Sequence, residues 1–377
     1  MKIKRRVLVL LGWHDPRTLL ALARHARQFG WLLETRHFFD DALPAGWSGD
    51  GMLVSDPRRM DVLRFMKSQA PRQPTVLIER NRPRIKITAH VHEDNVAAGR
   101  MAAEHLLAMG HRRFVWWTSA PGVVAAERLS GFRDTLARHG CDCLTLEYRG
   151  KGGKGEWMRR RKWLAKHLAA LEKPVALFAM DDQLAAEAVE MSIECGINVP
   201  RDLAVVGVGN IELASETSPV PITSIDNAPD AVAIAGAMLL DRLMAGAKPP
   251  TSSVVIPPLG LVVRQSSEAL AVTHPALLRG IDHLRISLEK PFDMEQLAAI
   301  MGMSARSVYH LYRSELRCTP ADFLLRERMS KAKIMLGNGS PQIKDLVSAC
   351  GFGTSRTMNR IFLRHEGCCP RDWKSLR

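Results

Sequence analysis

The stretch VALFAMDDQLAAEAVEMSIECGINVPRDLAVVGVGN, residues 175–210, holds two short apolar runs separated by a helical pattern. The runs at 175–180 and 203–209 are apolar throughout instead of alternating, which is typical of parallel strands covered on both faces. Between them, residues 183–195 carry apolar side chains at helical spacing. A strand, a helix and a second strand in this order predict a βαβ unit of an α/β fold.

The same alternation extends in both directions from this unit. Further strands are expected at 7–13, 51–55, 75–79 and 113–119, and further helices at 17–29, 95–109, 125–139 and 231–245. This order predicts a doubly wound α/β arrangement with parallel strands. Ligands of such folds bind beyond the C-terminal ends of the strands, so the residues that follow each strand are candidates for a site.

Several polar residues stand at those positions. Asp181, Asp182 and Asn210 follow the two strands quoted above, Asp94 lies in HVHEDN, and Arg128 opens the helix after WWTSAPG. Each has an ordinary structural explanation as a helix cap, a turn residue or a surface residue. Together, at one topological edge, they predict a polar pocket for a hydroxyl-rich ligand.

The composition indicates an anionic partner. The 377 residues are 46% hydrophobic, enough for two or three domains with real cores, and the net charge is +14. Residues 275–377 hold 17 Lys+Arg against 10 Asp+Glu, so the last quarter of the chain carries +7 of that excess. Such a balance favours nucleic acid or a membrane surface over a small-molecule enzyme.

The cysteines and apolar runs exclude several classes. The seven cysteines show no C-x-x-C pair and no disulfide framework, so we expect reduced thiols, no metal site and no cofactor. The longest apolar runs are too short to span a bilayer, and the N-terminus does not read as a signal peptide. These features favour a cytoplasmic protein.

A family resemblance extends the prediction of a pocket. DNVAAGRMAAEHLLAMGHRRFVWW (94–117) and AERLSGFRDTLARHG (126–140) resemble motifs of the sugar-sensing domains of the lactose- and galactose-repressor (LacI/GalR) family. The unit at 175–210 and SPVPITSID (218–226) continue in register, so the resemblance covers about residues 5–267. It implies a periplasmic-binding-protein-like fold, in which two α/β lobes joined by three crossing strands close on a ligand.

The resemblance also implies a ligand site. The residues that match its positions are Asp94, Arg128, Trp157, Asp181, Asp182 and Asn210. Arg128 stands where the family's arginine pairs with ligand hydroxyls or a carboxylate, and Trp157 falls near the place of an aromatic ring that stacks on a sugar. Gly209 departs from the pattern, because the family has an aspartate there. The effector implied is a sugar such as xylose, and the departure leaves its identity open.

The family's repressors carry a helix-turn-helix ahead of the sensor, whereas here the first sensor strand begins at Val7. We therefore expect a DNA-reading module after the sensor. MEQLAAIMGMSARSVYHLYRSEL (294–316) places a small residue, a glycine and an apolar residue, Ala298, Gly302 and Val308, at helix-turn-helix spacing. About 49 residues later, IKDLVSACGFGTSRTMNRIFLRHEG (343–367) repeats the pattern.

The whole of 280–377 resembles the DNA-binding domains of the AraC/XylS family, in which a long helix joins two helix-turn-helix units. Further helices are expected at 276–288, 320–336 and 355–364. Val347 and the pair Thr357-Met358 depart from the family pattern in the second unit and predict looser packing there. The domain boundaries expected are 1–270 for the sensor, 271–279 for a linker and 280–377 for the all-α DNA-binding domain.

The DNA-contacting residues follow from helix geometry. Val308, Leu311 and Tyr312 fall on one face and should form core, whereas polar residues near the N-terminus of each second helix meet base edges or phosphates. The candidates are Arg306, Ser307, His310, Arg313, Thr354, Ser355, Arg356, Asn359 and Arg360.

The combination predicts a transcription regulator, not an enzyme, whose binding to double-stranded DNA is controlled by a sugar and which acts as a homodimer without a membrane. Two alternatives stay open. One is a sensor that has lost its ligand response and binds DNA constitutively. The other is a sugar-binding or sugar-processing protein with a basic appendage, for which the sequence offers no nucleophile–base set.

Overall fold

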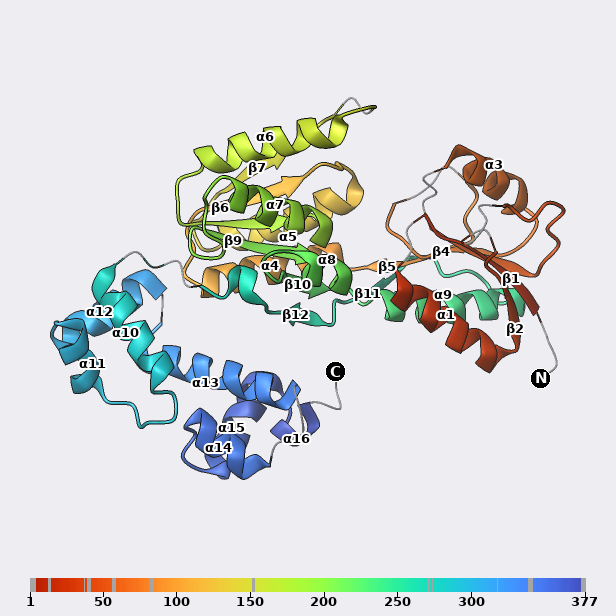
Figure 1. Cartoon of the computed structure of the whole chain (residues 1–377). Helices are drawn as coiled ribbons and strands as arrows, with labels where there is room; N and C mark the ends of the chain where they lie inside the picture. Colours follow the sequence, from red (N-terminus) through yellow and green to blue (C-terminus); the bar gives the residue numbers. More distant parts are fainter. Residues whose placement is uncertain are drawn as a thin grey trace. The chain divides into compact units, whose positions relative to one another are not determined.

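The computed structural model describes residues 5–12, 15–36, 38, 42–55, 59–81, 85–150, 153–269, 272, 274–316, 318–337 and 342–373 (Figure 1). Contacts divide the chain into two compact units. The first comprises Met1–Leu107 with Arg112–Ala269 and contains both β-sheets, and the second comprises Ala108–His111 with Leu270–Arg377.

The first unit has two lobes, each built on a six-stranded sheet. In the first lobe every pair of neighbouring strands is parallel. From edge to edge the order is β11 (Val254–Ile256), β5 (Ala89–Glu93), β4 (Thr75–Leu77), β3 (Gly51–Val54), β1 (Arg5–Leu10) and β2 (Trp31–Glu34).

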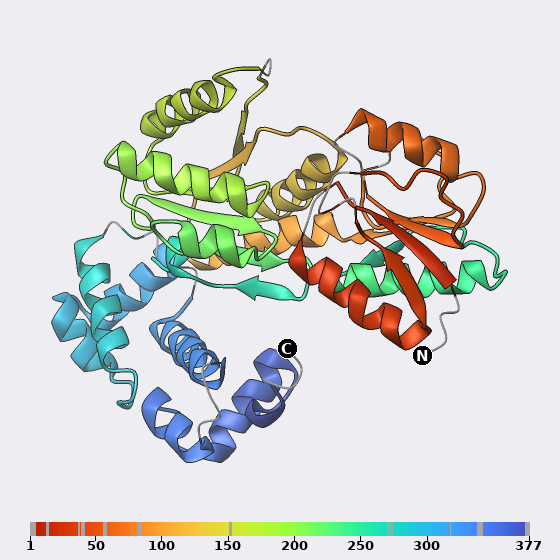
Figure 2. The same cartoon turned by 45° about the vertical axis from the view of Figure 1, so that its right-hand side comes forward.

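Alternate residues of β1 point into two cores. Val7 and Val9 face α1 (Pro16–Phe29) and α9 (Pro229–Met244), whereas Leu8 and Leu10 face the layer of α3 (Met60–Gln69). All four side chains are buried, as expected for a parallel strand covered on both faces. Figures 1 and 2 both show α1 and α9 side by side on one face of the sheet.

The second lobe repeats this plan with one antiparallel edge. From edge to edge the strands are β12 (Gly260–Val262), β10 (Thr223–Asp226), β9 (Leu203–Val208), β8 (Val175–Ala179), β6 (Phe114–Thr118) and β7 (Cys143–Glu147). Only β12 runs antiparallel to its neighbour among the described strands. Every residue of β8 and β9 is buried.

Helices cover both faces of the second sheet. One face packs against α4 (Asn95–Ala108) and α5 (Val123–Ala137), and the other packs against α6 (Glu156–Ala170) and α7 (Asp182–Glu194). Among the described residues, this unit also contains α8 (Glu212–Thr217) and the 3₁₀ turn η1 (Gln265–Ser267).

The chain passes between the lobes three times. It leaves the first sheet after β5, returns after β10, and crosses again between β11 and β12. This topology confirms the predicted two-lobed α/β fold. Strands β2, β5, β7, β10, β11 and β12 were not among the strands predicted from apolar runs, because they are short or only partly buried.

The second unit is helical and has two cores, which confirms the predicted all-α domain with two helix-turn-helix units. The first core lies among α10 (Pro275–Ile286), α11 (Met294–Met301), α12 (Ala305–Leu316) and the start of α13 (Pro320–Gly337). The second lies among the rest of α13, α14 (Ile343–Cys350) and α15 (Ser355–Glu366), with Trp373 of α16 (Pro370–Trp373) packed against it.

Two expectations about this unit are corrected. The predicted linker 271–279 is partly helical because α10 begins at Pro275; residues 271 and 273 lie outside the described residues. The second helix-turn-helix is not loosely packed where it is described. Met358 is fully buried in the second core and Val347 packs against that core, so both residues contribute to it.

Candidate functional site

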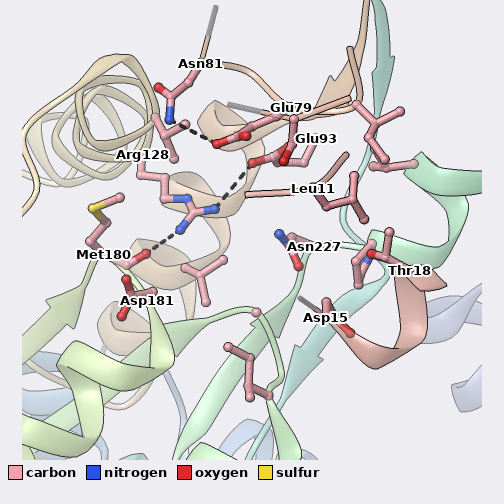
Figure 3. A pocket seen from close by; sticks show the side chains of 18 of the residues that line it. Leu11, Asp15, Thr18, Glu79, Asn81, Glu93, Arg128, Met180, Asp181 and Asn227 are labelled. Atoms are coloured by element: carbon pink, nitrogen blue, oxygen red, sulfur yellow. Dashed lines mark hydrogen bonds and ion pairs between the residues drawn. The ribbon is translucent and has the colours of Figure 1, made fainter. Parts of the chain in front are cut away.

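A cavity of about 280 Å³ lies between the lobes, at the C-terminal ends of strands from both sheets (Figure 3). This is the position at which doubly wound folds bind ligands. Its apolar lining includes Leu11, Ile78, Val124, Val208 and Val232. The polar and charged side chains of its lining are Asp15, Thr18, Ser55, Glu79, Asn81, Glu93, Arg128, Asp181, Gln183 and Asn227.

Arg128 projects from α5 into the cavity and is held by several partners. Its Nε donates to Asn95 Oδ1 at 2.9 Å, its Nη1 donates to the carbonyl of Met180, and its Nη2 lies 3.7 Å from Glu93 Oε1. Burial lowers the pKa of Arg128, whereas the charges of Glu93, Asp181 and Asp182 oppose this shift. The guanidinium is therefore fixed in place and keeps N–H groups directed at the cavity.

Asp181 lines the cavity and also caps α7. Its Oδ1 accepts a hydrogen bond of 2.8 Å from the Leu184 N–H, and the helix N-terminus favours its negative charge. A carboxylate held in this way retains lone pairs for a ligand hydroxyl. The structure thus brings Arg128 and Asp181 together in one cavity, as the sequence predicted.

Asp182 points away from the cavity. Its side chain is fully buried, its Oδ1 accepts a hydrogen bond from Ser224 Oγ at 2.5 Å, and its Oδ2 accepts one from the Ile211 N–H at 2.7 Å. Burial raises the pKa of Asp182 to about 6. The expectation that it contacts ligand is corrected: it joins the ends of β9 and β10 to α7.

Three other predicted ligand residues also lie outside the lining. Asp94 accepts a hydrogen bond from the Ala97 N–H at 2.9 Å, which is a cap at the start of α4. Asn210 is engaged by protein groups, donating to Asp226 and accepting from Arg264. Trp157 is 57% exposed on α6, where its ring lies beneath Arg161. These side chains serve local structure because strand-end position alone does not say where a side chain points.

The cavity contains polar residues that sequence reasoning missed. Ser55 follows β3, Glu79 and Asn81 follow β4, Glu93 ends β5, and Asn227 follows β10. The same strand-end rule that selected Asp181 would have selected them if applied to every strand of both lobes. The signal was weak because these strands are only three to five residues long.

Gly209 lines the cavity where the resembling family has an aspartate. Its φ of +129° lies in the region that favours glycine. A Cβ at this position would lie 3.1 Å from Ile211 Cγ1 and 3.4 Å from Asp182 Oδ2. An aspartate here would therefore be strained and would approach a buried carboxylate.

The first helix-turn-helix has the predicted geometry. Asp293 caps α11, which ends at Gly302 with a φ of +67°, and α12 follows. Ala298 and Val308 are buried, and Val308 and Tyr312 form core as predicted, with Leu311 partly buried against it. Ala298, Gly302 and Val308 thus occupy the positions predicted for the small residue, the turn glycine and the buried apolar residue of the second helix.

The second helix-turn-helix repeats this arrangement. Its first helix, α14, ends at Gly351 with a φ of +69°, and Thr354 caps α15 by accepting a hydrogen bond from the Thr357 N–H. Leu346, Cys350 and Phe362 are fully buried.

The predicted DNA-contacting side chains lie on the surface of α12 and α15. Ser307 is half-buried and hydrogen-bonded to Ser304, and the Arg313 guanidinium lies 5.7 Å from the centre of the Tyr309 ring. The exposed candidates are Arg306, His310, Arg313, Thr354, Ser355, Arg356, Asn359 and Arg360.

In the described part of the chain, no group of His, Cys, Asp or Glu is arranged to hold a metal ion. Nor is any described helix long and apolar enough to cross a membrane.

Both parts of the chain are similar to known protein families. Residues 103–267 match the family described as a periplasmic binding protein-like domain, and residues 297–375 match a helix-turn-helix domain. The xylose operon regulatory protein of Escherichia coli (strain K12) is 23% identical over 296 residues, covering 76% of this chain and 74% of that protein.

Solved structures show the same fold. The structure of the xylose-binding transcription activator xylR aligns over 100% of both chains with a TM-score of 0.61 and 20% identity. The transcriptional regulator CelR in complex with cellobiose aligns over 70% of this chain and 86% of its own, with a TM-score of 0.54 and 23% identity. All three of these proteins are transcription regulators.

Proposed function

We propose that this chain is a DNA-binding transcription regulator of the AraC type with a periplasmic-binding-protein-like sensor, and that an uncharged sugar bound between the sensor lobes controls its binding to DNA. The observation that carries the proposal is the cavity at the strand ends of both lobes, in which Arg128 and Asp181 present a fixed donor and a fixed acceptor. Sugar hydroxyls both donate and accept, so they can satisfy these groups together.

The surroundings of Arg128 favour a neutral ligand over a sugar acid. Its positive charge already faces Glu93 at 3.7 Å, with Asp181 beside the same cavity. A ligand carboxylate or phosphate would have to approach these negative groups, whereas a polyol adds no charge. Xylose is the first candidate, because two of the three proteins compared are named for xylose, and cellobiose, which the third protein binds, is the second.

Calorimetric titration of the full chain tests the ligand. The panel is D-xylose, L-arabinose, D-glucose, cellobiose and D-glucuronate. We expect one neutral sugar to bind and Arg128→Met to weaken that binding at least tenfold. Arg161→Met is the matched control. Arg161 lies on α6 outside the cavity and forms ion pairs with Glu190 and Glu194 of α7. Binding of glucuronate alone, or equal effects of the two substitutions, would contradict the proposal.

For the DNA side, we propose that two copies of the chain place α12 and α15 in successive major grooves of paired half-sites. Arg306, Ser307 and His310 of the first unit would read base edges, and Thr354, Ser355, Arg356 and Asn359 would do so in the second. Arg313 and Arg360 would contact phosphates, adding affinity without sequence information. All of these side chains except the half-buried Ser307 are exposed on α12 and α15 or at the start of α15, which supports this assignment. Such a regulator would act in the cytoplasm.

Fluorescence anisotropy with the DNA upstream of the chain's own gene tests this side. Arg306→Ala should cost about 1–3 kcal/mol of specific binding and change base preference. Arg360→Ala should instead weaken binding to all DNA sequences alike. It should also lower the number of ions released on DNA binding, measured from the salt dependence of the affinity, by about one. Arg133→Ala, which removes an exposed arginine of α5, is the control and should change neither. No DNA binding at low salt would rule the proposal out.

A second candidate is a regulator that binds DNA without responding to ligand. Gly209 favours it, because a carboxylate common at this position in the resembling family is missing. Adding the sugar panel to the anisotropy assay separates the two candidates. A DNA affinity that no sugar alters, together with no calorimetric signal, would support the second.

A further inference from the structure

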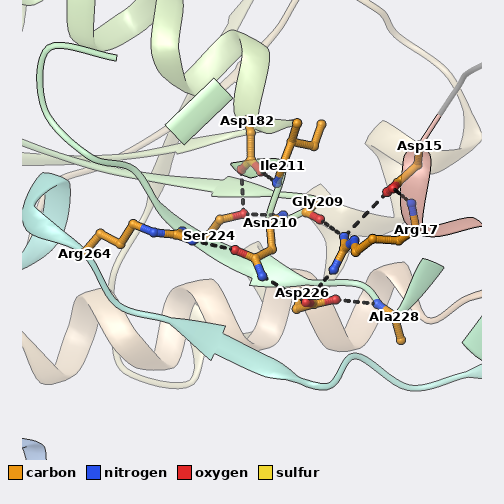
Figure 4. Close-up of polar contacts among 10 residues, drawn as sticks. All are labelled: Asp15, Arg17, Asp182, Gly209, Asn210, Ile211, Ser224, Asp226, Ala228 and Arg264. Atoms are coloured by element: carbon orange, nitrogen blue, oxygen red, sulfur yellow. Dashed lines mark hydrogen bonds and ion pairs between the residues drawn. The ribbon is translucent and has the colours of Figure 1, made fainter. Parts of the chain in front are cut away.

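One side chain of the first lobe reaches into the second. Arg17, near the start of α1, donates through Nη1 to Asp226 Oδ2 at 2.7 Å and through Nη2 to the carbonyl of Gly209 (Figure 4). Asp226 ends β10 and Gly209 follows β9, so both acceptors belong to the second sheet. The arginine therefore forms two hydrogen bonds, one of them an ion pair, across the space between the lobes.

The carboxylate of Asp226, which accepts the Arg17 hydrogen bond in the second lobe, is also held by other groups of the protein. Asp226 Oδ1 accepts a hydrogen bond from the Ala228 N–H at 2.9 Å, and Oδ2 accepts one from Asn210 Nδ2 at 3.0 Å. Asn210 has a φ of +51° and in turn accepts from Arg264 Nη2 at 2.8 Å. The Asp226 side chain is only 12% exposed. A carboxylate fixed in this way can bind Arg17 with little further loss of conformational freedom.

The acceptor at Gly209 depends on the absence of a side chain. With a φ of +129°, its peptide presents the carbonyl to Arg17. The family aspartate would place a second negative group next to Asp182 at this point. Gly209, which stands where the resembling family has an aspartate, thus accepts a hydrogen bond from Arg17 of the other lobe through its backbone carbonyl and not through a side chain.

Arg17 is also tied to the ligand cavity through Asp15. Asp15 Oδ1 accepts the Arg17 N–H at 2.8 Å, Oδ2 lies 3.5 Å from Arg17 Nη2, and Asp15 lines the cavity. Gly209 lines the same cavity. The interlobe contact and the ligand site therefore share two residues.

We propose that Arg17 is a positioning residue that clasps the second lobe to the first, and that it sets the fraction of sensors whose lobes are arranged for ligand binding. A ligand that needs both lobes binds only that fraction, so its apparent affinity falls when the fraction falls. The effect on ligand rests on the proposed function, whereas the clasp between the lobes does not.

The test substitutes Arg17 by Met and compares it with Arg5→Met. Arg5 also pairs with an aspartate, Asp241, at 2.9 Å, but both residues belong to the first lobe. The full chain is measured by hydrogen–deuterium exchange and by titration with the sugar identified above. Arg17→Met should increase exchange at 209–217 and 226–229 and weaken sugar binding about three- to tenfold, which corresponds to about 1 kcal/mol. Arg5→Met should change neither.

Exchanging the charges of Arg17 and Asp226 distinguishes the loss of this ion pair from a general folding defect. Asp226→Arg alone should behave like Arg17→Met or worse, and Arg17→Asp combined with Asp226→Arg should recover part of both readouts. If no sugar binds at all, the exchange comparison still decides whether the clasp exists. Exchange at 209–217 in Arg17→Met equal to that of Arg5→Met would overturn the proposal, as would unchanged sugar affinity in a variant with raised exchange.

Discussion

Arg128 and Glu93 come from different lobes and face each other in the cavity, with Nη2 and Oε1 3.7 Å apart and side-chain exposures of 6% and 14%. Because water screens the pair little, the charge of Glu93 should influence which ligands Arg128 accepts.

Removing that charge should change ligand preference in a defined direction. Glu93→Gln leaves Arg128 less compensated, so we expect affinity for D-glucuronate to rise relative to the neutral sugar by about tenfold. Calorimetry measures both ligands. Glu172→Gln is the control, because Glu172 pairs with Arg113 at an exposed site outside the cavity. An unchanged preference would show that Glu93 does not select on charge.

Two motif glycines should prove essential to the packing of α4 on α5. A Cβ at Gly131 would lie 2.0 Å from the carbonyl oxygen of Val96, and one at Gly99 would lie 2.0 Å from that of Arg128. Since backbone cannot yield easily, Gly131→Ala should lower the free energy of unfolding by about 1–3 kcal/mol. Urea denaturation measures this, and Ser130→Ala, at the exposed neighbouring position, should have little effect.

Asp182 should make the protein relatively more stable in mild acid. Its pKa is raised by burial to about 6, above the ordinary value of 3.8. Between these values the folded state binds a proton that the unfolded state does not, so this group adds stability as the pH falls from 7 towards 4. Compared with Asp182→Asn, the wild type should gain about 1 kcal/mol between pH 7.5 and pH 5 in urea denaturation. Parallel profiles would contradict this.

His105 should contribute with the opposite sign. Burial lowers its pKa to about 4, and its Nε2 lies 2.8 Å from Ser267 Oγ. As the pH falls below 6.5 the unfolded state gains a proton that the folded state resists, so stability is lost between pH 6.5 and pH 4. Relative to His105→Gln, the wild type should therefore lose stability over the interval in which Asp182 adds it.

Tyr312 contains a hydroxyl that the fold does not use. The side chain is fully buried, and among the described residues its oxygen has no hydrogen-bond partner. Tyr312→Phe should leave stability unchanged or raise it by about 1 kcal/mol, because a desolvated polar group is removed without a cavity. Tyr312→Leu, which does leave a void in the first core, is the contrasting variant. Thermal unfolding distinguishes them, and a clear loss in Tyr312→Phe would point to a partner for the hydroxyl.

Much of the fold could be predicted because apolar periodicity and turn glycines act locally. Gly302, which was predicted to take the turn of the first helix-turn-helix, ends α11 by its positive φ, and Gly351 ends α14 in the same way. Short strands such as β2 and β7 escaped because partial burial leaves no continuous apolar run.

The site was harder to predict because side-chain direction is decided by tertiary contacts. Asp181 and Asp182 are adjacent in sequence, yet one lines the cavity and the other is buried beneath Ser224 and Ile211. Glu93 gains its role only from Arg128, which lies 35 positions later and in the other lobe. No local pattern contains that information.

The return of α9 and β11 to the first lobe has a consequence for synthesis. The sheet that begins with β1 lacks its edge strand and one covering helix until Ile256 has been made, after the parallel strands β6–β10 of the other lobe. At about 5–20 residues per second, the nascent β1–β5 segment waits on the order of ten seconds with part of an apolar face uncovered. This segment therefore depends on protection from aggregation until α9 and β11 have been made.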